Sequence, residues 1–179
     1  MAAVLGFACF DTALGTCGIA WGEAGIVGSQ LPEVDAQATR RRMQLRFPGA
    51  LEAEPTAEAR AALQLVQAML RGEPADVGGL RLDMGGVPDF HRRVYEASLK
   101  LQPGQTTTYG EMARQLGEPG AARAVGQALG HNPFAPIVPC HRILAAGGRS
   151  GGFSAHGGAA TKLRMLAIEG AIAQGSLFD

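Results

Sequence analysis

The 179-residue chain is 46% hydrophobic and 18% charged, a composition typical of a globular protein with a core for one or two domains. Its net charge of zero hides a split: residues 1–90 carry 7 Lys and Arg against 11 Asp and Glu, and residues 91–179 carry 9 against 5. The positive second half suits an anionic partner. No segment is apolar enough to span a membrane, and residues 1–10 lack the basic start of an export signal, so we expect a cytoplasmic protein. An odd number of cysteines argues against a disulfide framework: Cys9, Cys17 and Cys140.

The first half of the chain predicts an antiparallel sheet followed by two helices. Short apolar runs alternate with glycine-containing turns across residues 3–31, which is typical of three strands joined as a meander. A helix is predicted at residues 35–47, with Asp35 as its N-cap. A second helix is predicted to begin near Thr56, because apolar residues recur there at helical spacing.

A segment rich in glycine and proline, residues 72–88, predicts a connector that contains one short strand. We place the domain boundary in this connector. An N-terminal α/β domain is therefore expected at residues 1–85 and a second domain at residues 86–179. A further helix is predicted to begin near Pro88.

Two short helices separated by a glycine-containing turn come next. Thr108 lies three residues before Glu111, the capping-box spacing that opens a helix. Residues 117–120 break this helix, and residues 121–129 form a second one of mostly small side chains, with Arg123 as its one long cation. The arrangement is the helix-turn-helix of many DNA-binding proteins, although a plain core element explains it equally well.

Residues 132–142 contain three prolines and end in the order Pro-Cys-His-Arg. Proline forbids helix and removes backbone donors, so we expect this segment to be extended and stiff. The order places Cys140 beside His141 and Arg142. The thiolate is the reactive form of cysteine, and neighbouring cations lower the pKa of a thiol, so the pattern indicates a nucleophile. A buried structural cysteine is the alternative interpretation.

The remaining chain predicts a short strand, a glycine-rich loop and a last helix. The strand begins at Ile143, and the glycines of residues 147–158 permit close approach of a ligand without the spacing of a phosphate loop. The helix is predicted at residues 159–169, so Glu169 falls in the final turn, where the helix dipole disfavours an anion. A histidine at an active site would compensate the charge of this acid. The simpler alternative is that Glu169 lies on the surface, where one unfavourable charge is tolerated.

Together these motifs resemble the O6-alkylguanine-DNA alkyltransferases, a family of DNA-repair proteins. The resemblance is dense over residues 88–170, and the Pro-Cys-His-Arg sequence after a helix-turn-helix is its most specific part. The first half of the chain resembles the family's variable first domain only loosely. The matching motifs are Thr108-Tyr109-Gly110, Ala122-Arg123-Ala124-Val125-Gly126, Asn132-Pro133, Pro139-Cys140-His141-Arg142, Gly152-Phe153-Ser154, Lys162 and Glu169-Gly170.

The resemblance implies a role for each matched site residue. Cys140 is expected to accept the alkyl group, His141 to take its proton through a water, and Glu169 to orient His141. Asn132 is expected to tie the recognition helix to the cysteine. Arg123 is expected to fill the gap left in the base stack. The residues expected to contact substrate or DNA are Tyr109, Ala122, Arg123, Ile143, Phe153 and Ser154.

The resemblance also implies the reaction, the partner and the fold. The reaction would be one irreversible alkyl transfer from guanine O6 in double-stranded DNA, with O4-alkylthymine left open as a second substrate. Because O6 is unreachable inside the duplex, the base must be flipped, and a helix of small residues suits approach through the minor groove. We expect a monomer without cofactor or membrane partner. The expected fold class is α+β, with a ribonuclease-H-like antiparallel sheet and helices first, and a mostly helical, winged-helix-like domain second.

The sequence departs from the family pattern at two places, and two other functions are alternatives. Phe153 stands where some members have tyrosine, and Ala155-His156 look like an insertion in the substrate loop. No metal site is expected, because the two cysteines of the first domain lack a nearby histidine pair. A non-catalytic sensor of alkylated DNA is the main alternative, but such relatives replace the cysteine found here as Cys140. A thiol hydrolase acting through an acyl-enzyme is the third reading, and it would not need the helix-turn-helix.

Overall fold

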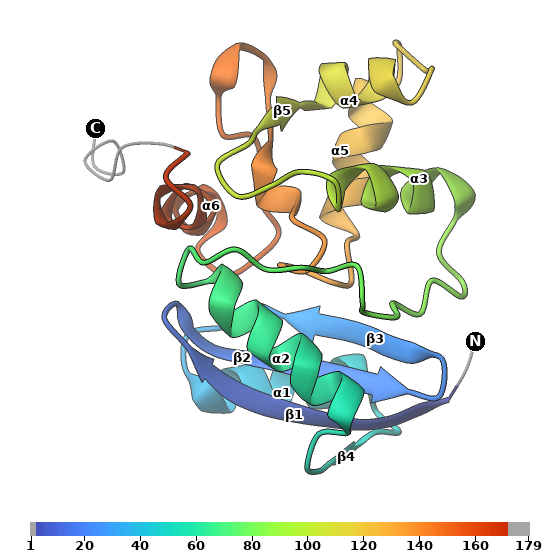
Figure 1. Ribbon diagram of the computed structural model, residues 1–179, viewed down its shortest axis with the longest axis vertical. Helices are drawn as coiled ribbons and strands as arrows, with labels where there is room; N and C mark the ends of the chain where they lie inside the picture. The colour runs from blue at the N-terminus through green and yellow to red at the C-terminus, as the bar shows by residue number, and fades with distance from the viewer. Residues whose placement is uncertain (1–2, 172–179) are drawn as a thin grey trace. The chain divides into compact units, whose positions relative to one another are not determined.

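The structure is a computed structural model, and it describes residues 3–171 (Figure 1). The fold is mixed α+β and divides into two compact units. The first unit contains Met1–Gly86 and the short segment Pro133–Ile137, and the second contains Val87–Asn132 and Val138–Asp179. The chain therefore leaves the second unit after Asn132 and re-enters it just before Cys140.

The first unit is built on a four-stranded sheet with the order β3-β2-β1-β4. The three predicted strands are present and antiparallel, and the first turn joins Thr12 to its partner Gly15. The fourth strand lies parallel to β1 and pairs through two residues only, so its sequence carries no alternation from which it could be predicted. The strands are β1 (Val4–Thr12), β2 (Gly15–Gly22), β3 (Gly25–Gln30) and β4 (Leu51–Glu52).

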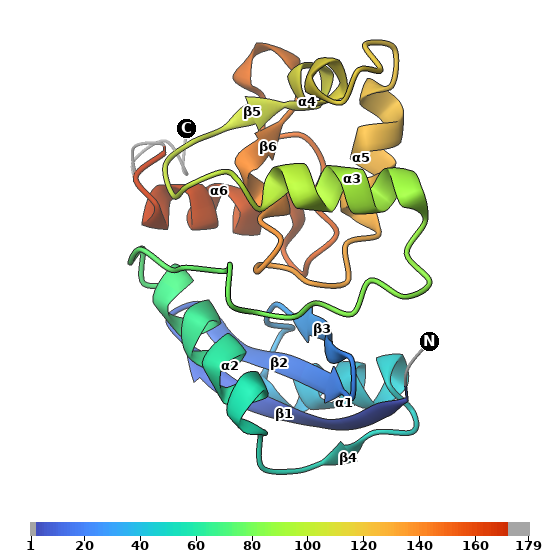
Figure 2. The same ribbon diagram turned by 45° about the vertical axis from the view of Figure 1, so that its right-hand side comes forward.

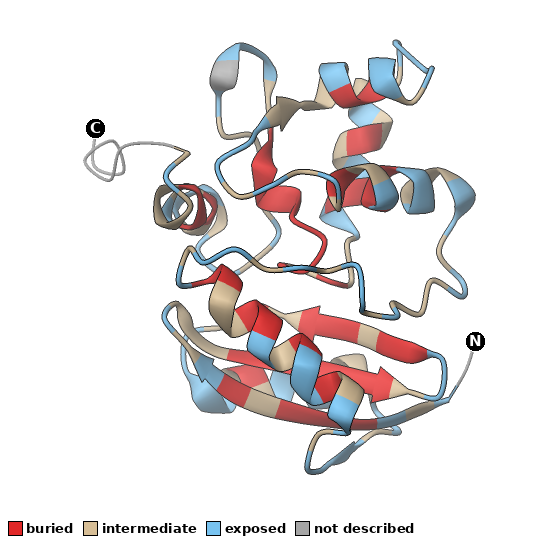
Figure 3. Cartoon of the chain, in the orientation of Figure 1, coloured by how far each residue is buried: buried red, intermediate tan, exposed pale blue. Residues whose placement is uncertain are grey.

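Two helices, α1 (Ala36–Arg46) and α2 (Ala57–Met69), cover opposite faces of this sheet (Figure 1, Figure 2). Asp35 caps α1 by accepting a hydrogen bond from the Ala38 N–H at 2.8 Å, as its position in the sequence predicts. Met43 of α1 is fully buried, and a Cβ atom at Gly18 would lie 2.6 Å from its side chain. Both faces of β1 and β2 are consequently buried, as Figure 3 shows.

The proline-rich segment Pro133–Ile137 belongs to the first unit and forms a series of turns. The expectation of an extended segment is therefore wrong. The Ser29 N–H donates to the Pro133 carbonyl at 2.9 Å, and the Ser29 hydroxyl donates to the Ala135 carbonyl at 2.7 Å. The half-buried guanidinium of Arg46 donates to the carbonyls of Ser29 and Pro133. Proline leaves its own carbonyl free as an acceptor, so these donors fold the segment against β3.

The second unit is mostly helical and contains a two-stranded parallel sheet (Figure 2). In this sheet Thr107 lies opposite Ile143 and Thr108 lies opposite Leu144. Helices α4 and α5 pack on each other as the predicted helix pair, and α5 also packs on α3. The elements are α3 (Asp89–Ser98), β5 (Thr107–Thr108), α4 (Tyr109–Gln115), α5 (Ala122–Gly130), the 3₁₀ turn η1 (Cys140–Arg142), β6 (Ile143–Leu144), the 3₁₀ turn η2 (Ala146–Gly148) and α6 (Gly158–Ile168).

One sequence-based expectation about the middle of the chain needs correction. The short strand expected in residues 72–88 is a single isolated bridge between Ile26 and Leu82. Helix α3 follows Pro88 as predicted and buries Val94, Tyr95 and Ser98, and the Tyr95 hydroxyl donates to the Ala128 carbonyl of α5. Within residues 3–171 no helix is long and apolar enough to cross a membrane.

Candidate active site

Cys140 is the first residue of the 3₁₀ turn η1, and strand pairing brings Tyr109 close to it. The turn runs directly into β6, which pairs with β5, so Tyr109 at the start of α4 lies close to the thiol. Both side chains line a pocket of about 350 Å³, a size that falls within the range of small-molecule sites. Its lining residues are Tyr109, Gly126, Leu129, Gly130, Cys140, Gly152, Phe153 and Ser154.

The thiol at this pocket is only 6% exposed. Burial raises the pKa of Cys140, and a side-chain hydrogen bond from Asn132 and the positive charge of Lys162 oppose that rise in part. The sequence predicted a lowered pKa from the adjacent His141 and Arg142. The direction of that prediction is wrong. Desolvation of the thiol is the largest effect on its pKa, and the Arg142 guanidinium is paired with the carboxylate of Glu169.

Asn132 connects the end of α5 to the cysteine turn. Its Nδ2 donates to the Val138 carbonyl at 2.8 Å, and its side chain also forms a hydrogen bond with Cys140. The Cys140 N–H donates to the same Val138 carbonyl at 2.8 Å. One carbonyl thus receives the donors of both residues and fixes the distance between the helix end and the thiol.

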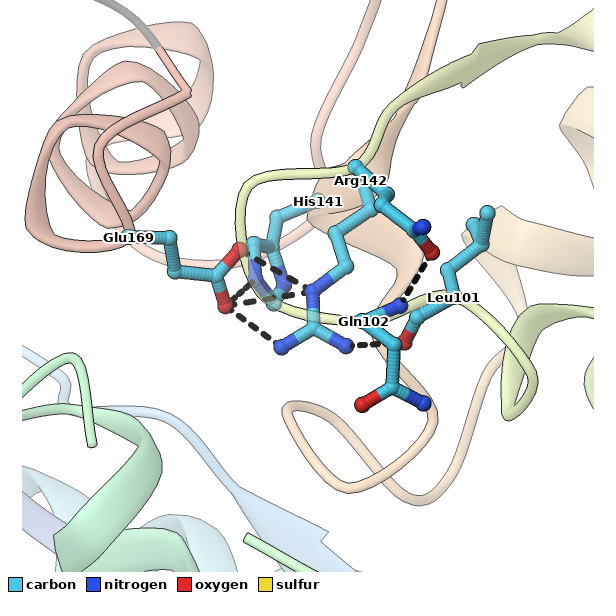
Figure 4. A network of polar contacts seen from close by, with 6 residues as sticks. Leu101, Gln102, His141, Arg142 and Glu169 are labelled. Carbon is cyan, nitrogen blue, oxygen red and sulfur yellow. Dashed lines mark hydrogen bonds and ion pairs between the residues drawn. The ribbon is translucent and has the colours of Figure 1, made fainter. Parts of the chain in front are cut away.

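His141, Arg142 and Glu169 form a buried network next to the thiol (Figure 4). Glu169 is the C-cap of α6, and its Oε1 lies 2.8 Å from His141 Nε2. Arg142 donates to both oxygens of the same carboxylate at 2.7 and 2.9 Å, and its Nη1 donates to the Leu101 carbonyl at 2.6 Å. The acid that opposes the helix dipole is therefore neutralised by a buried bidentate arginine.

The charges of this network determine the tautomer and the protonation of the histidine. Burial alone would raise the pKa of Glu169, but hydrogen bonds from His141 and Arg142 outweigh it and lower the pKa to about 2. Burial lowers the pKa of His141 despite the nearby carboxylate, so the imidazole is neutral at pH 7. An ionised carboxylate only accepts, so Nε2 carries the proton. The other nitrogen, Nδ1, is buried without a hydrogen-bond partner in the described residues.

The structure brings some of the expected substrate residues to the pocket and leaves others away from it. Tyr109, Phe153 and Ser154 line the pocket together with Cys140. The side chain of Ile143 is fully buried and does not line it. Ala122 and Arg123 lie in the first turn of α5, outside the lining residues, and Arg123 is exposed.

Sequence reasoning did not assign a role to several residues that build the site. In the sequence Arg142 is only a neighbour of the cysteine, and its pairing with Glu169 has no local signal, because the two residues lie 27 positions apart. Gly151 adopts φ +72°, and a Cβ there would lie 2.5 Å from the Tyr109 hydroxyl, so only glycine permits this position of the tyrosine. The small residues Gly126 and Gly130 of α5 form a pocket wall. Lys162, matched without a role, is buried beside the thiol.

Groups of three or more metal-ligating side chains are absent from residues 3–171, and Cys9, Cys17 and Cys140 are free thiols there. Beside the pocket the structure places one thiol, one imidazole and one carboxylate: Cys140, His141 and Glu169. These are the types of group that covalent catalysis uses as nucleophile, base and orienting group.

Comparison with known proteins shows which family this chain resembles. Residues 89–171 match the family model described as 6-O-methylguanine DNA methyltransferase, DNA binding domain. The chain is 50% identical over 90 residues to the methylated-DNA--protein-cysteine methyltransferase of Mycobacterium tuberculosis, an alignment covering 50% of this chain and 53% of that protein. The match thus spans about half the length of this relative. A protein of the same name from Methanothermobacter thermautotrophicus is 30% identical over 158 residues, covering 88% of this chain and 81% of that protein.

The likeness extends over the whole chain in three dimensions. The crystal structure of Mycobacterium tuberculosis OGT in complex with DNA superposes with a TM-score of 0.75 at 34% sequence identity, covering 98% of this chain and 100% of that chain. A crystal structure of an O6-methylguanine methyltransferase from the same organism gives a TM-score of 0.72 at 34% identity, covering 97% of this chain and 99% of that chain. On this evidence the chain belongs to the methylated-DNA--protein-cysteine methyltransferase family.

Proposed function

We propose that this protein repairs DNA by moving an alkyl group from O6 of guanine to the sulfur of Cys140, once per molecule. The observation that carries the proposal is the position of this thiol at a pocket beside a neutral histidine that is oriented by a buried carboxylate. The acceptor is the protein itself and a thioether is a poor leaving group, so the reaction ends after one turnover.

The proposed reaction is a displacement at the alkyl carbon. The Cys140 sulfur forms a bond to that carbon while the carbon–O6 bond breaks. The thiol proton passes to Nδ1 of His141, directly or through a water, and is then returned to the departing guanine, which becomes the normal base. Atoms and charges balance without a cofactor. Glu169 holds the imidazole in the tautomer that leaves Nδ1 able to accept.

Substrate binding requires the guanine to leave the duplex, because its O6 atom is not reachable inside the helix. Tyr109 and Ser154 would hold the flipped base in the pocket, and Phe153 would supply an apolar wall. Gly126 and Gly130 of α5 have no side chains, so this part of the pocket wall suits close approach through the minor groove of double-stranded DNA. Arg123, exposed at the start of α5, would occupy the space that the base vacates.

The proposal also assigns a role to each domain. Residues 86–179 would carry DNA binding and catalysis in a winged-helix-like domain, in which α4 and α5 are the helix pair. Residues 1–85 would form a ribonuclease-H-like domain, a description supported by three antiparallel strands and a fourth strand parallel to the first. One thiol and one pocket suffice for one lesion, so we propose that the protein acts as a monomer.

The test is the intact mass of the protein after incubation with duplex DNA containing O6-methylguanine. We expect one added methyl group per molecule, mapped to the peptide that contains Cys140, and none on the Cys140→Ser variant. A methyl group on Cys9 or Cys17, or repeated turnover, would reject the proposal. Tight binding to the alkylated duplex without any mass change would favour the sensor function instead.

A further inference from the structure

Two histidines of the second unit lie against each other where α3 packs on α5 (Figure 2). His91 is the third residue of α3, and His131 is the C-cap of α5. Their ring centres are 5.9 Å apart, and the ring planes are inclined by 29°. The proposed alkyl transfer uses neither residue, since neither lines the pocket at Cys140.

The hydrogen bond of His131 leaves one ring nitrogen available as a metal ligand. Its Nδ1 lies 2.8 Å from the carbonyl oxygen of Gln127. A carbonyl oxygen only accepts, so Nδ1 carries the proton of this contact, and Nε2 of the neutral ring presents its lone pair. Histidines that bind metal ions almost always hold their second nitrogen in this way, by donating to a carbonyl or carboxylate that fixes the tautomer and the ring.

His91 is held in place by the residue one helical turn later. Its ring meets the ring of Tyr95 edge to face, with ring centres 6.2 Å apart. Tyr95 is buried, and its hydroxyl donates to the Ala128 carbonyl of α5 at 2.6 Å. A buried contact between the two helices therefore fixes where His91 lies relative to the end of α5.

Both imidazoles are accessible to water and ions. His131 is exposed and His91 is half-buried. Among the described residues no carboxylate forms an ion pair with either ring, in contrast to the buried His141. No third histidine, cysteine or acidic side chain within residues 3–171 completes a group of three with them, so water molecules would complete the coordination of an ion.

The spacing of the two rings suits one shared ion. A zinc–nitrogen bond is about 2.0–2.1 Å long, and a ring nitrogen lies roughly 1.1 Å from the centre of its ring. Two imidazoles bound to one ion therefore have centres roughly 5 Å apart at a tetrahedral angle, and about 6.4 Å apart when they face each other across the ion. The observed 5.9 Å lies between these values, so the helices need not move to bind the ion.

We propose that His91 and His131 form a two-histidine site for a divalent transition-metal ion, which fastens the end of α5 to α3. Imidazole is a ligand that suits zinc, copper and nickel, and Zn²⁺ is the probe chosen for the tests. The site lies in the second unit and uses no cysteine. His131 directly precedes Asn132, whose side chain donates to the Val138 carbonyl, so the ion would hold the helix end from which Asn132 reaches the cysteine turn.

The first test is a titration of the full chain with Zn²⁺, followed by NMR of protein labelled at the histidine Cε1. The sequence has four histidines, so each signal can be assigned by substitution. The signals of His91 and His131 should shift together, with one ion bound per molecule, while those of His141 and His156 stay in place. The Cys140→Ser variant is titrated in parallel, because a thiolate is itself a zinc ligand. Shifts spread over all four histidines, or confined to His141, would overturn the proposal.

Substitutions distinguish two rings that share an ion from two rings that only stack. His91→Asn and His131→Asn should each weaken Zn²⁺ binding at least about tenfold, and the double variant should lose little more, because one substitution already breaks the shared site. The matched control is His156→Asn, at an exposed histidine of the glycine-rich loop, which should bind Zn²⁺ as the wild type does. If His91→Asn or His131→Asn kept the wild-type affinity, the rings would not share an ion and the proposal would be overturned.

Hydrogen exchange measures whether the ion fastens the helix end. Zn²⁺ should slow exchange of the His131 and Asn132 amides, whose N–H groups close the last turn of α5, and should raise the melting temperature of the wild type but not of His91→Asn. Binding with unchanged exchange at these amides would overturn the fastening role. These readouts use no DNA, so a failure of alkyl transfer would reject the proposed function and leave the metal site standing.

Discussion

The side chains of His141 and Glu169, separated by 28 residues in the chain, meet at 2.8 Å between Nε2 and Oε1. Both are buried, and the same carboxylate also carries the bidentate contact from Arg142. Glu169 therefore orients the histidine and at the same time compensates a buried guanidinium. Changes at this acid should affect both reactivity and stability, and the two effects can be separated.

Replacing the acid tests its part in the chemistry. Glu169→Gln should slow alkyl transfer by at least about tenfold, because the imidazole loses its orienting acceptor, while affinity for alkylated duplex stays near that of the wild type. The variant should also lose roughly 3 kcal/mol of unfolding free energy, since Arg142 keeps a buried charge without its partner. Rates should be measured well below the melting temperature. The control is Glu118→Gln, which removes an exposed ion pair with Arg93.

If Glu169→Gln transferred the alkyl group at a normal rate but no longer bound alkylated duplex, the orienting role of Glu169 would be contradicted.

The lowered pKa of Glu169 predicts a loss of stability in acid. A carboxyl group whose pKa is about 2 when folded stabilises the protein above its unfolded pKa of about 4.3 and loses that contribution between these values. About 3 kcal/mol should disappear over this interval. The lowered pKa of His141 adds to the loss once the pH falls below about 6.5. Urea unfolding at a series of pH values measures this, and the decline between pH 4.3 and 2 should be flatter in Glu169→Gln.

The contacts of Asn132 predict an effect on the thiol and on the fold. Asn132→Ala leaves the Val138 carbonyl with one donor fewer and removes the hydrogen bond that lowers the pKa of Cys140. We expect a loss of about 1–3 kcal/mol of unfolding free energy and slower alkylation of Cys140 by iodoacetamide at pH 7. The control is Gln67→Ala, which removes an exposed amide-to-carbonyl hydrogen bond to Asp11. An unaltered alkylation rate would confine Asn132 to a structural role.

Arg123 should matter for duplex DNA and hardly for a free base. Because flipping costs a few kcal/mol and about 1.4 kcal/mol corresponds to tenfold, Arg123→Ala should lower the rate or affinity on duplex tenfold or more. The reaction with free O6-benzylguanine, which needs no flipping, should change little. Equal losses on both substrates would remove the flipping role.

A phosphate contact at Arg123 would give a different result. Arg123→Ala would then chiefly flatten the dependence of binding on salt, and Arg123→Lys would restore most of the activity. Both variants are therefore compared at two salt concentrations. Arg114→Ala, at an exposed residue of α4 paired with Glu111, controls for the general loss of positive charge.

Local signals in the sequence were sufficient for most of the secondary structure. Asp35, Thr56 and Thr108 cap their helices by the hydrogen bonds that their positions predict. Strand β4 was not predicted, and the strand predicted in residues 72–88 is only an isolated bridge at Leu82, since both depend on pairing with a distant strand. The turns of residues 133–137 depend on donors supplied by Ser29 and Arg46, more than eighty residues away in sequence.

The sequence pointed to Cys140, His141 and Glu169, which lie together in the structure, whereas it did not predict their electrostatics. A cysteine beside a histidine and an arginine suggests a thiol with a lowered pKa. Burial reverses that sign at Cys140, and Arg142 turns to Glu169. Desolvation and partner choice are properties of three-dimensional packing, so no spacing of residues along the chain encodes them directly.

Because Pro133–Ile137 belongs to the first unit, the two units cannot be separated by a single cut in the chain. A gene fragment beginning at Val87 would encode the whole second unit, but it would also carry Phe134 and Ile137, which are fully buried in this chain. Ser29 and Arg46, which donate to the Ala135 and Pro133 carbonyls of the same segment, would be left on the other fragment. Recombination at the linker would thus separate groups that contact each other in this chain. Exchanging first units between relatives should succeed only when this five-residue segment is exchanged with them.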